Sequence, residues 1–383
     1  MSEILDFDSA GDWLDGQNHQ TRVWFGARSA LRCLPALETR SEDLFNGFRA
    51  ALIASAASRD HDGGRVRFAK AAGAAAEAIA DAALYDEEAH ERAALSLQCA
   101  LFTVCDSQQD SVLFARNTLG RTAASARELV APTGPDPQNP EYKPEDLPDR
   151  ERAASSIYRA AHLDSLQPLS WPPLWHDEQL ANPFPSLAPS VFGHSDGNSR
   201  NRYFLYDWYD AILKGTPLPW ELTQRIALEI TDRHWESGQA VLERRISEIR
   251  AAYDVQVIAH GIAESAHLSQ PGGPGMGHNQ PPSLADDDLP AQAPETIIWV
   301  AADELRTQAQ AETPTPSRIK RALSLIAGVL KASGLWVAGT VATGISVATV
   351  TVVKKGADAW AVQNQDKLVE LIDAALKWLS LLF

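Results

Sequence analysis

Two pairs of carboxylate and imidazole side chains have the spacing that metal sites in helical proteins use. Glu87 and His90 are three residues apart, and so are Glu264 and His267. On a helix this spacing places both side chains on one face, as in di-iron carboxylate bundles. Such a site also needs an inward-facing glutamate from each of two further helices, and surface pairs with this spacing are common. We therefore predict no metal site and no cofactor.

A second group of titratable side chains could support general acid and base chemistry, because carboxylates with unequal pKa values can share proton transfer. Its members lie close in sequence to one histidine, but nothing in their spacing fixes a mutual distance. A hydrolytic enzyme with its site here is the less favoured hypothesis, and capping or solvated roles are favoured instead. The group consists of Asp207, Asp210, Glu229, Asp232, His234 and Glu236.

Nucleophile motifs are missing from the sequence. The three cysteines, Cys33, Cys99 and Cys105, form no CxxC spacing and fall in apolar helical patterns, so we expect reduced, buried thiols. We also find no HExxH, Walker or nucleophile-elbow pattern. We name no catalytic residue and expect a protein that is not an enzyme.

Aromatic residues are concentrated between residues 171 and 235. Tryptophan side chains in such a region usually anchor a small core, because each buries 150–250 Å². The alternative is a surface that contacts a partner protein. The candidate residues for that surface are Trp171, Trp175, Trp208, Tyr209 and Trp235.

The most apolar stretch of the chain is Ala332 to Val353, which contains no charged residue. As a helix its 22 residues would extend about 33 Å, enough to cross a hydrocarbon core of roughly 30 Å. Small residues recur along it at intervals of four, which favours close helix association in membranes. The candidate contact residues are Trp336, Ala338, Gly339, Ala342, Gly344 and Ala348.

A second pattern, from Asp366 to Phe383, is amphipathic, with Trp378 placed where it could lie at a headgroup boundary. We favour membrane association for the tail. Two alternatives stay open, because six of the 22 residues from 332 to 353 are Ser or Thr and residues 345–353 are strongly β-branched. The run could be a buried helix of a soluble oligomer, or a strand.

The charge balance excludes one class of partner. The net charge of −16 leaves no excess of Lys and Arg for neutralising phosphates, so we predict no nucleic-acid partner. Residues 314–383 carry eight basic and four acidic side chains, which leaves a net charge of −20 for residues 1–313.

The first residues lack the basic and apolar regions of a signal peptide. We therefore expect a cytoplasmic body with a basic, hydrophobic tail at the inner membrane.

The elements that would position these residues are all helical. Alanine-rich patterns predict helices over 20–37, 41–58, 65–84, 87–105 and 109–130, separated by breakers such as Pro35 and Gly63. Further helices are expected at 152–163, 219–232, 239–253 and 296–312. We predict an all-α protein in five parts: an Ala-rich domain (1–130), a Pro-rich linker or lid (131–151), a Trp-rich domain (152–268), a disordered linker (269–295) and C-terminal helices (296–383).

Three short motifs carry a resemblance: the stretch Asp207–Asp210 with Gly215 after it, the turn Trp235–Gly238, and residues 277–282 with the sequence GHNQPP. With the Ala-rich helices, they resemble a group of bacterial proteins that share this order of parts and often end in a hydrophobic helix. The resemblance covers residues 20 to 383. It implies an architecture, and it implies no activity and no functional residue.

These observations lead to one favoured hypothesis. We expect a membrane-associated, non-enzymatic interaction protein whose helical body binds a partner and whose tail anchors or oligomerises. A pore-forming effector is a sharper form of it. The alternative is a soluble homo-oligomeric helical scaffold.

Overall fold

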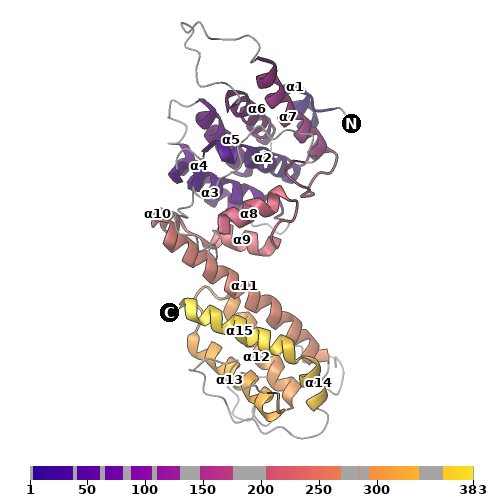
Figure 1. Ribbon diagram of the computed structural model, residues 1–383, viewed down its shortest axis with the longest axis vertical. Coiled ribbons are helices and arrows are strands. Elements are labelled where there is room, and N and C mark those ends of the chain that lie inside the picture. Colours follow the sequence, from indigo (N-terminus) through magenta and orange to yellow (C-terminus); the bar gives the residue numbers. More distant parts are fainter. Residues whose placement is uncertain are drawn as a thin grey trace. The chain divides into compact units, whose positions relative to one another are not determined.

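A computed structural model shows an all-α protein (Figure 1). It describes residues 3–37, 41–60, 65–80, 88–105, 110–129, 147–175, 204–268, 284, 293–335 and 357–382. The chain forms two compact units, Met1–Gln239 and Ala240–Phe383. The predicted fold class is therefore confirmed.

The N-terminal unit begins with α1 (Phe7–Asp15) and α2 (His19–Cys33), which a short 3₁₀ turn, η1 (Leu34–Leu37), follows. The Ala-rich helices are next, and α2 packs against three of them, α3, α5 and α6. They are α3 (Ser41–Ala57), α4 (Arg65–Ala80), α5 (Glu88–Cys105) and α6 (Ser111–Leu129). The unit also contains α7 (Leu147–Ser165), α8 (Phe204–Leu213), α9 (Trp220–Glu229) and α10 (Asp232–Glu236).

Local sequence sets the ends of the first helices. Asp6 caps α1, because its carboxylate accepts a hydrogen bond from the Ser9 amide at 2.9 Å while Ser9 Oγ accepts one from the Asp6 amide. Asn18 caps α2 by accepting from the Thr21 amide at 2.8 Å. Helix α1 was not predicted, since its acidic sequence gives a short apolar pattern.

Helix α4 buries one apolar stripe along its length. Phe68, Ala72, Ala75, Ala76 and Ile79 are each at most 3% exposed. Mostly small side chains form this stripe, so neighbouring helix axes can approach closely. Helix α4 packs on α3 and α5, as Figure 1 also shows.

The described residues of the C-terminal unit form five helices around an apolar core. They are α11 (Gln239–Leu268), α12 (Pro294–Gln310), α13 (Pro316–Ala332), α14 (Ala357–Gln363) and α15 (Gln365–Leu382). Proline occupies the first helical position of α12 and of α13, where its missing N–H costs nothing. Helix α13 ends before Gly334, whose φ of 72° is in the left-handed region that glycine tolerates.

The tail helices use their apolar faces inside this core. Residues from Ala322 to Leu330 of α13 are almost all buried, and α15 is amphipathic as predicted. Trp378 is only 2% exposed and belongs to the core, so its predicted place at a headgroup boundary is wrong. Within the described ranges no helix is both long and apolar enough to cross a membrane.

The observed division of the chain differs from the five predicted parts. Helices α8 to α10 belong to the same unit as the Ala-rich helices, and α3 packs against α9. Helix α11 extends to Leu268 and belongs to the C-terminal unit except for its first residue. Leu284, in the predicted linker 269–295, is 6% exposed and is part of the C-terminal core.

Candidate functional site

The densest polar chemistry in the described residues is on one face of α2. Three of its side chains, four residues apart, donate hydrogen bonds to main-chain carbonyls of residues 170–174. Trp24 Nε1 donates to the Ser170 carbonyl at 2.9 Å. Arg28 donates from Nη1 to Pro172 and from Nη2 to Pro173, both at 3.1 Å, and Arg32 Nη2 donates to Leu174 at 3.0 Å.

The helix and the segment match in spacing. Four residues of α-helix rise about 6 Å, and two residues of an extended proline-type chain rise about 6.2 Å. Each step of four along α2 therefore advances two residues along the segment, from 170 to 172 to 174. Proline favours this extended conformation at Pro172 and Pro173. We call Trp24, Arg28 and Arg32 the α2 ladder.

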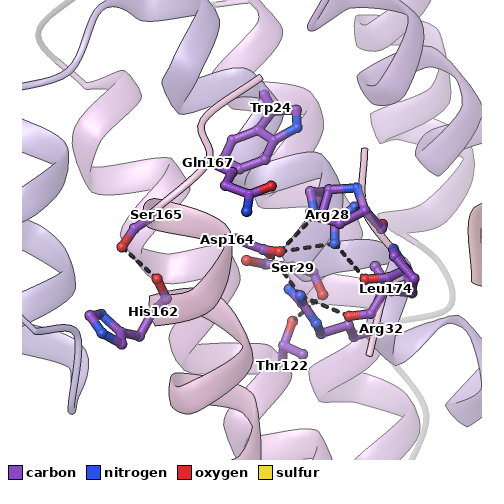
Figure 2. Close-up of polar contacts among 12 residues, drawn as sticks. Trp24, Arg28, Ser29, Arg32, Thr122, His162, Asp164, Ser165, Gln167 and Leu174 are labelled. Atoms are coloured by element: carbon purple, nitrogen blue, oxygen red, sulfur yellow. Dashed lines mark hydrogen bonds and ion pairs between the residues drawn. The ribbon is translucent and has the colours of Figure 1, made fainter. Parts of the chain in front are cut away.

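A buried acid joins the two arginines of the ladder. Asp164, at the end of α7, accepts from Arg28 at 2.9 Å and from Arg32 at 2.7 Å. The Arg28 and Arg32 side chains are 0% exposed and that of Asp164 is 1% exposed (Figure 2). Burying an ion costs several kcal/mol, so each of these charges depends on its partners. The network ties α7 and residues 170–174 to α2.

Arg32 is the less satisfied of the two arginines. Its Nε and Nη1 have no hydrogen-bond acceptor among the described residues, and Ser29 Oγ also lacks a partner there. Burial lowers the pKa of Arg32, and the Asp164 carboxylate partly opposes that shift. The guanidinium lies 5.6 Å from the Trp175 ring centre, and this aromatic face provides a further favourable contact for its charge.

The segment is held from its other side by the turn after α8. The Leu174 amide donates to the Leu213 carbonyl at 3.3 Å. Gly215 has a φ of 71°, and a Cβ at this position would lie 2.5 Å from the Pro173 nitrogen. Only glycine fits there, because the backbone is left-handed and the chains approach closely.

Three of the five predicted partner-surface aromatics have buried side chains. Trp171 (6% exposed), Trp208 (1%) and Tyr209 (3%) belong to the core of the N-terminal unit, as the core-anchor interpretation expects. Trp208 and Tyr209 pack edge-on against Phe48 of α3, and Tyr209 Oη donates to the Leu31 carbonyl at 3.2 Å.

The other two aromatics, Trp175 and Trp235, are partly exposed. Each ring centre lies close to the guanidinium of a buried arginine, Trp175 at 5.6 Å from Arg32 of α2 and Trp235 at 5.9 Å from Arg49 of α3. A partner-binding role for them stays a prediction.

Four of the candidate acid–base residues contact separate side chains. Asp210 pairs with Lys214 at 2.6 Å, and Glu229 pairs with Arg225 at 2.7 Å. Asp232 pairs with Arg49. His234 Nδ1 is 2.8 Å from Thr231 Oγ1, in a cap of α10. These contacts assign structural roles.

Asp207 lies in the first turn of α8, and Glu236 is exposed at the end of α10.

Within the described residues, the histidines of the two carboxylate–histidine pairs lie beside other side chains. His90 Nε2 lies 3.0 Å from Asp43 Oδ2, and both side chains are buried. The His267 ring lies 4.6 Å from the Trp299 ring. No group of three or more His, Cys, Asp or Glu side chains suited to a metal occurs in the described part of the chain. Glu87 lies outside the described residues.

The cysteines occupy two kinds of environment. All three are free thiols, and Cys33 and Cys99 are buried as predicted. The predicted burial is wrong for Cys105, which is exposed at the last residue of α5. Burial raises the pKa of Cys33 to about 11, although hydrogen bonds from Ser96 and Thr122 oppose the shift. Such a thiol is a poor nucleophile at neutral pH.

The candidate association residues of the tail lie outside the described residues, as does most of the predicted linker 131–151. These tail residues are Trp336, Ala338, Gly339, Ala342, Gly344 and Ala348. Of the predicted span 332–353, only residues 332–335 are described.

Sequence reasoning did not identify the α2 ladder or Asp164. One signal was available in the sequence. Arg28 and Arg32 are four residues apart and have apolar neighbours such as Leu31, and two arginines on an apolar helix face indicate buried charges. Asp164 is 136 and 132 residues from its two partners, so sequence alone gave no reason to join them. No family model matches the chain, and neither a curated protein nor a solved structure shows significant similarity to it.

Proposed function

We propose that this chain is a non-enzymatic helical interaction protein that associates with a membrane surface through its charge-free segment, residues 336–353. The segment keeps the small-residue spacing and the absence of charge that favour helix association and insertion. The described polar networks support the non-enzymatic part of the proposal, because their contacts are structural.

The observation that carries the proposal is the attachment of both flanks of the segment to one core. Helix α13 ends just before it and α15 begins after it, and the two helices pack together (Figure 1). Gln365 Nε2 donates to the Leu335 carbonyl at 3.4 Å. Both flanks therefore lie on the same side of any bilayer that the folded unit contacts. A single crossing of roughly 30 Å of hydrocarbon would separate them. We propose contact from one side instead of a single span.

A second candidate function is a soluble homo-oligomeric scaffold. The burial of the apolar faces of α13 and α15 within their own core favours it, since those faces are then unavailable to lipid. In this case residues 336–353 would pair with a second copy.

Vesicle flotation and light scattering of the full chain test both candidates. We expect the wild type to float with vesicles, and Ala342→Asp/Ala348→Asp to stay at the bottom of the gradient, because each buried aspartate costs about 2.5–3.5 kcal/mol in a bilayer. Val362→Asp is the control, since Val362 is 54% exposed. A wild type that ignores vesicles but forms a defined oligomer supports the scaffold. A monomer that ignores vesicles refutes both.

A further inference from the structure

The buried network on α2 contains more positive than negative charge. The side chains of Arg28 and Arg32 are 0% exposed, and in the described part of the chain Asp164 is the one carboxylate that pairs with them. An arginine side chain stays protonated in proteins, so neither guanidinium can discharge by losing a proton. Two cations and one anion leave an excess of one positive charge in the interior of the N-terminal unit.

Arg32 has the donors that this network leaves without acceptors. Its Nη2 donates to Asp164 at 2.7 Å and to the Leu174 carbonyl at 3.0 Å. Its Nε and Nη1, in contrast, have no hydrogen-bond partner among the described residues. An aromatic face attracts a cation but contributes no net negative charge, so the Trp175 ring, centred 5.6 Å away, leaves the excess in place.

Ser29 adds a third donor beside these two. It is three residues before Arg32 on α2, and side chains on a helix point back toward its N-terminus, so the Arg32 guanidinium extends toward the Ser29 position (Figure 2). Ser29 Oγ is buried and also lacks a partner in the described ranges. A hydroxyl can donate as well as accept. Three unpartnered donors therefore lie at the part of the network where positive charge is in excess.

We propose that Arg32 and Ser29 bind one small monovalent anion of the chloride type. A single negative charge balances the excess of the network, in which Asp164 is the counter-charge that the chain itself supplies. Hydrogen bonds from a guanidinium to an anion are among the strong ones. The anion must be small, because the side chains of Arg28, Arg32 and Asp164 are at most 1% exposed. The inference concerns the N-terminal unit and does not depend on the membrane association proposed above.

A buried water molecule is the alternative occupant. Water often bridges buried polar groups and could accept from Arg32. It is neutral, however, and would leave a charge unbalanced in a site where an uncompensated ion is costly. Arg49 of α3 provides the contrast. It is buried and its Nε also lacks a partner in the described ranges, but it pairs one to one with Asp232, so its charge is balanced. The excess charge, more than the unpartnered donors, favours the anion.

The test measures whether chloride protects α2. Hydrogen exchange of the full chain is compared in sodium chloride and in sodium gluconate at the same ionic strength, so that screening is equal and the anions differ in size. A ligand of the folded state slows exchange through unfolding by a factor of one plus its concentration divided by its dissociation constant. For a dissociation constant of about 10 mM, about 0.5 M chloride should slow the most protected α2 amides about 50-fold. Amides of α12 and α13 should exchange equally in both salts.

Three variants test whether the effect comes from this network. Arg32→Met removes the excess charge and the two donors, so its α2 amides should exchange equally in both salts. Arg49→Met is the matched control, because it removes a buried arginine with an aromatic neighbour, Trp235 at 5.9 Å, and a balanced charge. Its chloride effect should equal that of the wild type. Ser29→Ala keeps both charges and should weaken chloride binding about fivefold, the equivalent of one hydrogen bond.

Each outcome supports or overturns the anion site. Equal α2 exchange of the wild type in the two salts would overturn it and favour water. Equal slowing of α2, α12 and α13 by chloride would overturn it as well, since the salt would then act on the whole chain. Loss of the chloride effect in both arginine variants would mean that any buried arginine produces it.

A second measurement uses the wild type alone, in case Arg32→Met does not fold. In crystals grown in sodium bromide, anomalous scattering should locate a bromide ion beside Arg32. A bromide peak absent from Arg32 but present elsewhere on the protein would overturn the proposal.

Discussion

Replacement of Asp164 by asparagine should destabilise the N-terminal unit by about 3–5 kcal/mol, the cost of breaking a buried ion pair from one side. Asp164 accepts from both arginines of the α2 ladder, at 2.9 and 2.7 Å, in a site that is at most 1% exposed. Two charge-assisted hydrogen bonds at about 1.5–3 kcal/mol each give a similar total. Two guanidinium groups would remain buried with no counter-charge.

The assay must resolve the two units, because a chain with two units need not unfold in one step. Hydrogen exchange followed by mass spectrometry does so, since it reports on α2 and α7 separately from the C-terminal unit. A loss of 3–5 kcal/mol corresponds to roughly 100-fold to 5,000-fold faster exchange of the most protected α2 amides. Amides of α12 and α13 serve as an internal reference.

The control is Asp210→Asn, which removes a carboxylate of the same type from an exposed pair. Asp210 and Lys214 are 32% and 65% exposed, so this change should cost about 0.3–0.5 kcal/mol. A loss of stability below about 1 kcal/mol for Asp164→Asn would refute the prediction that the two arginines depend on this carboxylate. It would mean that water or another group reaches the guanidinium groups and replaces the lost charge.

Three further predictions concern separate parts of the structure. Burial raises the pKa of Cys33 from 9.0 to about 11 in the folded state, so the protonated thiol stabilises the fold. This contribution to the free energy of unfolding is fully present below about pH 9, and about 3 kcal/mol of it is lost as the pH rises through 11. In urea unfolding measured at several pH values, Cys33→Ala should not show this loss. Gly215→Ala should lower the free energy of unfolding by about 3 kcal/mol, because the new Cβ meets Pro173 and the backbone is left-handed. Gly238→Ala is the control and should cost about 1 kcal/mol, since Gly238 also has a positive φ, 87°, but open space around it. Equal losses of stability in thermal unfolding would refute the close contact with Pro173. Trp378→Ala should lower the stability of the C-terminal unit by about 3–5 kcal/mol in urea unfolding; unchanged stability with weakened vesicle binding would instead support a headgroup position.

The helices were predictable because alanine-rich periodicity and breakers act locally. The predicted range 41–58 became α3 at Ser41–Ala57, and 87–105 became α5 at Glu88–Cys105. The prediction ended one helix at Tyr253, but α11 continues to Leu268, because its later apolar residues such as Ile262 are buried against the C-terminal helices. Packing between distant segments, which sequence patterns do not report, decided that boundary.

The candidate site was less predictable for the same physical reason. A charged residue on an apolar helix face, such as Arg28, signals a buried partner, but the partner lies more than 130 residues away. The aromatic residues were recognised as important from their type, whereas burial separated core anchors such as Trp208 from partly exposed residues such as Trp235. The type of a residue can be read from the sequence, whereas the exposure of its side chain depends on the completed fold.

The α2 ladder holds residues 170–174 by their carbonyl oxygens, which every amino acid possesses. These hydrogen bonds do not depend on which side chains the segment carries, but they do depend on its length. Substitution at position 172 or 173 should therefore be tolerated more often than an insertion or deletion between 170 and 174. A change in length would move the later carbonyls away from the donor groups of the helix. In divergent homologues we expect Trp24, Arg28 and Arg32 to vary together with the length of this segment and not with its composition.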